Sequence, residues 1–171
     1  MLPVQPTMKE KFVPRKDIPR IGWVLVDAVD NWTADFACQN CKFPHVRYVH
    51  ELKHKNTGTI ISVGCVCAQH LTQDFATPRL REKALRSWAG RRMRWPTLNW
   101  KRSYKGNLFL KKQGMVIVVR PSGGKWVASY KPADDNQGIW TSVKGLHDTP
   151  EEAKLASFDA LYSPSKTWSD H

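Results

Sequence analysis

The sequence lacks several features that would assign it to a familiar class. It contains no uninterrupted run of 18 apolar residues, which a membrane-spanning helix would need. Charged side chains occupy the first 20 residues, where a secretory signal would need an apolar stretch: Lys9, Glu10, Lys11, Arg15 and Lys16. It also has no Walker loop, no dinucleotide-binding fingerprint, no nucleophile elbow and no internal repeat. We therefore expect a folded cytoplasmic protein that has no membrane partner and is not an enzyme.

Acidic residues are almost missing from the middle of the chain. Between Arg79 and Lys112 there are 12 Lys or Arg and a single acid, Glu82, whereas the remaining sequence is nearly balanced in charge. A one-sided cluster of this kind repels itself, and a polyanion such as nucleic acid relieves the repulsion. The expected nucleic-acid contacts are Arg79, Lys83, Arg86, Arg91, Arg92, Arg94, Lys101, Arg102 and Lys105.

Aromatic residues are interleaved with these cations, and rings can stack on exposed bases. They are Trp88, Trp95, Trp100, Tyr104 and Phe109. The alternative is that the tryptophans are core residues; we favour it for Trp88, and both interpretations stay open for Trp95 and Trp100.

Cysteine is also scarce, and its spacing is informative. Cys38 and Cys41 form a Cys-x-x-Cys turn, and Cys65 and Cys67 follow after 23 intervening residues. Zinc takes four tetrahedral sulfur or nitrogen ligands, and reduced cytosolic thiols do not form a disulfide framework. The predicted zinc ligands are Cys38, Cys41, Cys65 and Cys67, with His70 as an alternative fourth ligand, and with His45, His50 and His54 as further candidates. The competing interpretation is four buried thiols in a small core.

Proline, turn residues and caps divide the chain into segments of an α+β protein. Residues 1–20 contain four prolines and predict an extended or disordered arm. Residues 21–76 predict a small zinc-ribbon β module with strands over 22–29, 47–52 and 59–63. Residues 77–98 predict a basic helix.

The basic helix and the C-terminal segment have their own start and stop signals. Thr77 as N-cap and Pro78 in the first turn start the helix, which ends near Arg94 with an apolar arc of Leu80, Ala84, Leu85 and Trp88. Residues 99–171 predict an antiparallel sheet of three to four strands, over 107–112, 115–120, 125–131 and 139–144. A packed helix then begins at a capping box of Thr149 and Glu152 and ends near Ser163.

Two short segments resemble known families. The run from Cys38-x-x-Cys41 through Arg47-Tyr48-Val49-His50 to Val63-Gly64-Cys65-Val66-Cys67-Ala68 resembles a zinc-ribbon segment of uncharacterised bacterial and phage proteins. This resemblance implies structural zinc, Cys67 as the matching ligand of the second pair, and a bacterial or phage origin.

The C-terminal segment resembles the sheet-plus-helix DNA-binding domains of the ethylene-response-factor and integrase arm-binding types. The residues that carry the resemblance are Gly124-Lys125-Trp126-Val127-Ala128, Thr149-Pro150-Glu151-Glu152-Ala153 and Phe158-Asp159-Ala160. It implies that the sheet enters the major groove with Arg120, Lys125 and Lys131 as its basic residues. The order of elements also fits the double-stranded RNA-binding domain, but Glu151 and Glu152 stand where that domain has a basic pair.

These observations predict a zinc-containing nucleic-acid-binding protein in an accessory or regulatory role, with DNA favoured over RNA. One alternative is a small phage or plasmid inhibitor that binds a protein component of a nucleic-acid-processing complex through the same basic face. A third is a zinc-ribbon nuclease using His50 or His54. The deaminase order of His-x-Glu before a Cys-x-x-Cys pair is absent, because His50 is followed directly by Glu51 and comes after Cys41.

Overall fold

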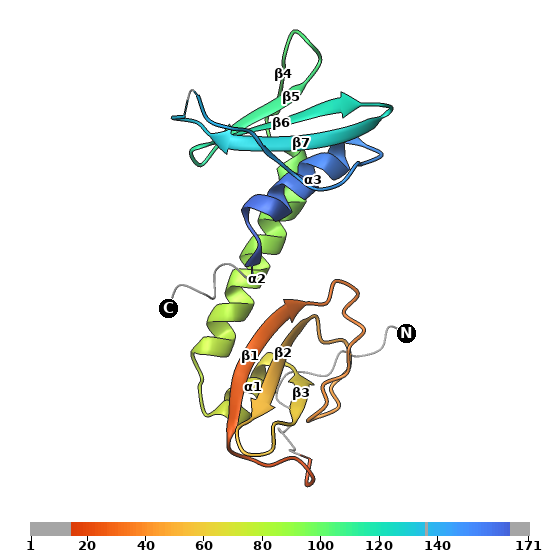
Figure 1. The fold of residues 1–171 in the computed structure, drawn as a ribbon. Helices are drawn as coiled ribbons and strands as arrows, with labels where there is room; N and C mark the ends of the chain where they lie inside the picture. Colours follow the sequence, from red (N-terminus) through yellow and green to blue (C-terminus); the bar gives the residue numbers. More distant parts are fainter. Residues whose placement is uncertain (1–14, 136, 165–171) are drawn as a thin grey trace, which may run out of the picture. The chain divides into compact units, whose positions relative to one another are not determined.

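The computed structural model describes residues 15–135 and 137–164, and the chain falls into two compact units. Unit 1 comprises Met1–Arg86 and unit 2 comprises Ser87–His171. Each unit has an antiparallel sheet and helical segments (Figure 1), so the predicted α+β class is confirmed. None of the helices in the described residues is both long and apolar enough to cross a membrane. The predicted arm over residues 1–20 falls mostly outside the described residues.

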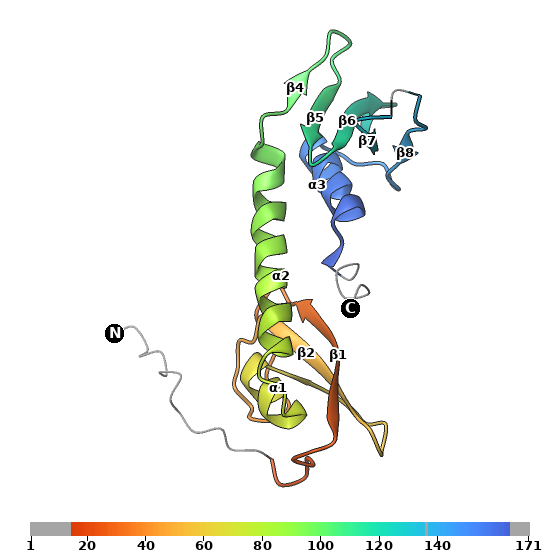
Figure 2. The same cartoon turned by 90° about the vertical axis from the view of Figure 1, so that its left-hand side faces the viewer.

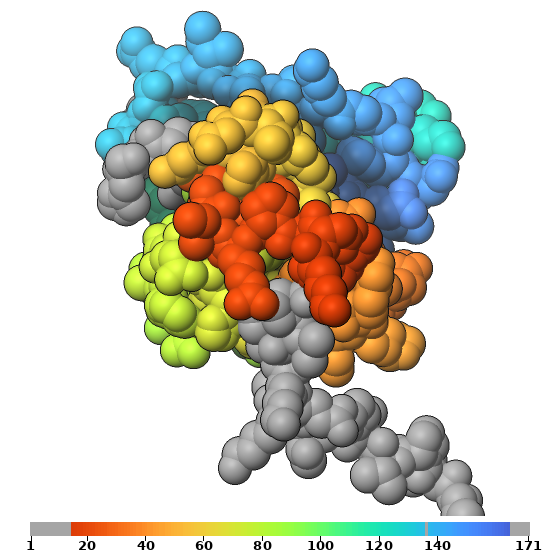
Figure 3. Space-filling view, turned by 90° about the horizontal axis from the view of Figure 1, so that it is seen from below, coloured from red at the N-terminus to blue at the C-terminus, as the bar shows by residue number. Residues whose placement is uncertain are grey.

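The sheet of unit 1 is a three-stranded meander in the order β1-β2-β3. Its strands are β1 (Trp23–Asp30), β2 (Tyr48–His54) and β3 (Ile60–Val63), close to the three expected from the sequence. Alternation in β2 puts His50, Leu52 and His54 on one face. The turn after β2 lies against the segment that leads into β1 (Figure 3). The Lys55 N–H there donates to the Gly22 carbonyl at 2.8 Å.

A short helix that the sequence analysis did not predict follows β3 directly. This helix, α1, spans Cys65–Thr72 and contacts β1 and β2 (Figure 2). Cys67, Ala68 and Leu71 are its buried residues that join the core of unit 1. Its N-cap is Gly64, which makes no side-chain capping bond, so the usual hydroxyl or carboxylate signal for a helix start is missing.

The basic helix, α2, spans Thr77–Arg94, and the boundary between the two units falls inside it. Its start is capped differently from the prediction: Oδ1 of Asp74 accepts bonds from the N–H groups of Ala76 and Thr77, both at 2.9 Å. Thr77 is therefore a residue of the helix rather than its cap. Its end at Arg94 agrees with the prediction, and a 3-10 turn, η1 (Trp95–Thr97), follows.

The apolar arc expected for α2 is partly wrong. Leu85 is buried and Trp88 packs against the core of unit 2, but Leu80 is 64% exposed. The buried stripe includes Pro78 and Leu85, and Leu80 lies about 140° from Leu85 around the helix because each residue turns it by about 100°.

The sheet of unit 2 is a five-stranded meander in the order β4-β5-β6-β7-β8. The strands are β4 (Lys101–Arg102), β5 (Leu108–Lys112), β6 (Met115–Ser122), β7 (Lys125–Pro132) and β8 (Thr141–Ser142). Strand β4 was not predicted from the sequence, and β8 lies within the longer strand predicted over 139–144. Both are two residues long, and strands this short carry no alternating pattern.

Helix α3 (Pro150–Leu161) covers one face of this sheet through β6 and β7 (Figure 1). Its predicted start is confirmed, since Oγ1 of Thr149 accepts a bond from the N–H of Glu152 at 3.2 Å. Trp95 and Phe158 are buried with Leu110 and Ile117 between helix and sheet, and the Trp95 indole donates to Oγ of Ser157 at 3.3 Å.

Candidate metal centre

The loop between β1 and β2 forms a tight turn around the first cysteine pair. The Cys38 carbonyl accepts a bond from the Lys42 N–H, and the Cys38 N–H donates to the Phe43 carbonyl, both at 2.9 Å. The Gln39 side chain then ties the turn to β3, because its Oε1 accepts a bond from the Ser62 N–H at 2.7 Å. The turn is therefore anchored to the strand that leads into α1.

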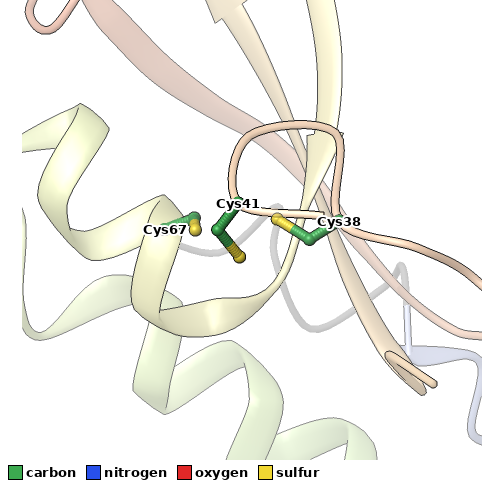
Figure 4. A group of neighbouring side chains, drawn as sticks. All are labelled: Cys38, Cys41 and Cys67. Atoms are coloured by element: carbon green, nitrogen blue, oxygen red, sulfur yellow. The ribbon is translucent and has the colours of Figure 1, made fainter. Parts of the chain in front are cut away.

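Three of the four cysteines meet beside this anchor. The sulfur atoms of Cys38, Cys41 and Cys67 all lie within 4.8 Å of one another. The first two come from the turn and Cys67 from α1 (Figure 4). Tetrahedral coordination at a zinc–sulfur distance of 2.3 Å requires sulfur atoms about 3.8 Å apart, so this group could hold a metal ion with little rearrangement.

The surroundings of Cys38 favour the ionised form of its thiol. Nδ2 of Asn40 donates to the Cys67 sulfur at 3.3 Å, and the Gly64 N–H donates to the Cys38 sulfur at 3.5 Å. The pKa of Cys38 is lowered to about 5, chiefly because the Cys67 thiol donates a hydrogen bond to it. The same shared proton raises the pKa of Cys67. A bound cation would replace that proton and leave both sulfur atoms as thiolates.

Cys65 does not belong to this group, although the sequence analysis placed it among the four ligands. Cys65 and Cys67 are the first and third residues of α1, and positions two apart on a helix point about 160° away from each other. They would share one ion in an extended turn but not in a helix. No other His, Cys, Asp or Glu in the described part of the chain joins the three thiols.

Cys65 is instead part of a second group with His50 and Glu82. A ring nitrogen of His50, the Cys65 sulfur and a Glu82 oxygen all lie within 4.8 Å of one another. Burial raises the pKa of the Cys65 thiol to about 11, and the neighbouring Glu82 carboxylate adds to that rise. This group could also hold a metal ion. His50 is a candidate ligand in the sequence, but no spacing in the sequence connects it with Glu82.

The remaining histidine candidates lie outside both groups. His70 is exposed, and its ring contacts the Phe75 ring edge-on at 5.4 Å. His54 is buried, with Nε2 bonded to the Ile21 carbonyl and Nδ1 to the Thr57 hydroxyl. His45 is exposed in the loop before β2.

The basic residues predicted to contact nucleic acid lie in both units, and most of them are exposed. Eight of the nine side chains are exposed, Arg92 being the exception. Nε and Nη2 of Arg92 donate to the two carboxylate oxygens of Asp159 at 2.7 and 2.9 Å, which ties α2 to α3 within unit 2. Arg92 is therefore a structural residue as well as a cation.

Two of the three basic residues predicted for a DNA-binding sheet in unit 2 are already bonded to other groups of the protein. Lys125 forms an ion pair with Asp148, and Nζ of Lys131 donates to the Asp135 carbonyl at 2.9 Å. Arg120 is exposed on β6.

The aromatic residues of the basic segment fall into two kinds. Trp95 is 3% exposed, and Trp88 and Trp100 pack against the core of unit 2. Tyr104, by contrast, projects fully into solvent from the turn between β4 and β5. Lys105 in the same turn is also exposed, as are Lys101 and Arg102 of β4. Of the three tryptophans and Tyr104, only Tyr104 presents a ring that a base could stack on without unpacking the core.

Comparisons of this chain with protein-family models, with curated proteins and with solved structures found no significant match. What the structure itself defines is an α+β protein with two groups of side chains that could hold metal ions.

Proposed function

We propose that this chain is a zinc-containing protein that binds nucleic acid, with DNA preferred to RNA, in an accessory or regulatory role. The observation that carries the proposal is the exposure of eight of the nine predicted contact residues in a segment with one acid. Glu82, that one acid, accepts a bond from Nε of Arg86 at 3.1 Å. The cationic excess is therefore presented to solvent, where phosphate groups can reach it.

The three-thiol group supports zinc as the structural metal. Thiolate ligands favour soft and borderline cations over magnesium or calcium, and a Cys-x-x-Cys turn is a common half of a zinc site. Cys38 and Cys67 belong to the core of unit 1, so an ion there would crosslink the β1–β2 loop to α1. Zinc would thereby stabilise unit 1.

Metal analysis of the full chain tests this part of the proposal. Protein purified without added metal and dialysed against a mild chelator should retain about one zinc per chain. Cys38→Ser should lose it, while Cys65→Ala should keep it, because only Cys38 belongs to the three-thiol group. Less than about 0.3 equivalents in a fully folded wild-type protein would disprove structural zinc.

The salt dependence of binding tests the basic segment. On duplex DNA, each phosphate contact contributes about 0.9 to the slope of log affinity against log salt. Changing Arg91 and Arg94 together to Gln should flatten the slope by about 1.8, and should weaken all sequences alike. Arg92 is left unchanged because its loss would disturb unit 2. Lys53→Gln with Lys55→Gln removes the same charge outside the segment and should leave the slope unchanged.

If the Arg91/Arg94 variant keeps the wild-type affinity and slope, the basic segment does not bind phosphates. The inhibitor interpretation then replaces this one, and the same residues should be protected by an acidic protein surface.

The exposed ring of Tyr104 allows a separate test with single-stranded DNA. Replacing it with Ala should weaken binding to single-stranded DNA by about 1–3 kcal/mol, the usual contribution of one stacked base. Tyr104→Phe keeps the ring and should bind like wild type. Equal losses in both variants would show that the ring does not stack.

A further inference from the structure

A second ligand group lies in unit 1, outside the three-thiol group. Its members are His50 on β2, Cys65 at the start of α1, and Glu82 on α2. Three different elements thus bring an imidazole, a thiol and a carboxylate together. Cys65 and Cys67 lie on nearly opposite faces of α1. The Cys-Val-Cys run therefore contributes one sulfur atom to each of the two groups.

His50 is prepared for binding at one of its two ring nitrogens. The side chain is completely buried, and Nε2 lies 3.1 Å from the Pro78 carbonyl oxygen. A carbonyl only accepts, so Nε2 carries the proton and Nδ1 of the neutral ring carries the lone pair. Among the described residues, Nδ1 is buried and has no hydrogen-bond partner. Metal-bound histidines commonly have this arrangement, with the second nitrogen donating to a backbone carbonyl.

Without a ligand, this arrangement is unfavourable. A buried acceptor that lacks a partner costs about 1–3 kcal/mol relative to its hydrated state. A cation held by Nδ1 together with Cys65 and Glu82 would satisfy that lone pair. The ion pair between Glu82 and Arg86 uses only Oε1 of the carboxylate, so Oε2 remains to bind a metal.

A pocket of about 290 Å³ adjoins this group. Cys65 and Glu82 line it together with three exposed cations of α2, Arg79, Lys83 and Arg86. The four α2 residues occur at spacings of three, four and seven, which places them on one face of the helix. An anion in this pocket would lie against all three cations and beside an ion held by Glu82.

We propose that His50, Cys65 and Glu82 bind a second divalent transition-metal ion, and that the adjoining pocket admits a phosphate group to an open position on that ion. Three protein ligands leave a tetrahedral metal one position for an exchangeable ligand. The three cations give that position a preference for a multiply charged oxyanion. This site does not require zinc at the three-thiol group or nucleic-acid binding by Arg91 and Arg94.

The metal stoichiometry of the full chain tests whether His50, Cys65 and Glu82 bind a second ion. Equilibrium dialysis against excess zinc should give about two ions per chain for wild type and about one for Glu82→Gln. Cys65→Ala should behave like Glu82→Gln. The matched control is Glu51→Gln, the same change on β2 at a neighbour of His50 outside both groups, and it should keep two ions. An equal number of ions in wild type and in Glu82→Gln would overturn the proposal, whatever the three-thiol group holds.

Phosphate binding at the metal is tested with cobalt as a spectroscopic replacement for zinc. Inorganic phosphate should shift the absorption of the Cys65-bound cobalt in wild type and should have no effect in Glu82→Gln. Arg79→Gln with Lys83→Gln should weaken this phosphate response by about tenfold without changing the metal stoichiometry. Lys53→Gln with Lys55→Gln is the matched control and should respond like wild type.

Two probes distinguish whether the site binds a phosphodiester or a terminal phosphate. A response to dimethyl phosphate as well as to inorganic phosphate identifies backbone phosphodiesters, whereas a response to inorganic phosphate alone identifies terminal phosphates. A spectrum that neither probe changes would refute phosphate binding at the metal.

Discussion

Gly22 occupies a position in unit 1 that other residues would fill only with strain. Its φ is +90°, and a Cβ there would lie 2.8 Å from Nε2 of His54. Nε2 is itself bonded to the Ile21 carbonyl at 3.2 Å, so the His54 ring cannot withdraw without losing that bond. Glycine is therefore needed at position 22, where the turn after β2 meets the start of β1.

Gly22→Ala is therefore expected to destabilise unit 1 more than the same change at Gly58. Gly58 also has a positive φ of +71°, but a Cβ there would meet no atom of the described residues within 4 Å. We expect a loss of about 1–2 kcal/mol for Gly58→Ala from the backbone conformation, and at least about 1 kcal/mol more for Gly22→Ala from the close contact. Urea unfolding of the zinc-loaded variants measures the difference. Equal losses would show that the His54 ring moves aside freely.

Tyr162 follows α3 and buries its hydroxyl in unit 2. The ring contacts Trp95 and Phe158, and the hydroxyl has no hydrogen-bond partner among the described residues. Burial raises the pKa of this hydroxyl above its ordinary value of 10.0. Ionisation is therefore easier in the unfolded chain than in the folded one.

Stability of unit 2 should consequently be complete below about pH 10 and fall as the pH rises above that value. Tyr162→Phe should reduce this alkaline loss and should cost little at pH 7, because the hydroxyl it removes is unpaired. Denaturant unfolding of both proteins at pH 7 and pH 10.5 checks both statements. A large destabilisation of Tyr162→Phe at pH 7 would mean that the hydroxyl has a partner.

At the scale of the elements, α2 depends on a cap, Asp74, that lies three residues before its first residue, Thr77. Asp74 accepts bonds from two N–H groups at the start of the helix, which would otherwise be unpaired. Asp74→Ala should destabilise unit 1 by about 1 kcal/mol, while Asp74→Asn, which keeps an acceptor oxygen, should cost less. Thr77→Ala should have a smaller effect than Asp74→Ala. The reverse order in urea unfolding would restore Thr77 as the cap.

Helix α1 shows how one element decides the chemistry of a site. As an extended turn, the run from Cys65 to Cys67 would present both sulfur atoms to the Cys38–Cys41 turn. As the first turn of a helix, it directs Cys67 toward that turn and Cys65 toward His50 and Glu82. The pairing of thiols is therefore a property of the element and not of the spacing in the sequence.

At the scale of the whole molecule, the candidate metal ligands all belong to unit 1. The core of unit 2 is built from Trp95, Leu110, Ile117 and Phe158 and contains no cysteine. Metal should therefore contribute to the stability of one unit and not to that of the other.

Treatment of the full chain with a strong chelator should accordingly open unit 1 while unit 2 stays folded. Hydrogen exchange should accelerate at the backbone amides of β1–β3 and α1 and should be unchanged in β5–β7 and α3, because only unit 1 loses ligand bonds. Addition of zinc should restore protection. Equal loss of protection in both units, or no loss in either, would contradict the assignment of metal to unit 1.

Much of the fold could be predicted because its causes are local. Alternating apolar residues and turn residues predicted β1 to β3 and β5 to β7, and the Thr149 cap predicted the start of α3. The concentration of cations between Arg79 and Lys112 is likewise a property of the sequence alone. These features depend on residues within a few positions of one another.

Only the tertiary structure decided which distant residues meet. It separated Cys65 from Cys67, brought Cys65 to Glu82, buried Trp95, exposed Leu80 and paired Arg92 with Asp159. Each outcome depends on the rotation of a helix about its axis and on what packs against it. The spacing of residues in the sequence does not determine that rotation when the cap is a glycine, as at Gly64, or when the apolar stripe is interrupted by arginines, as in α2.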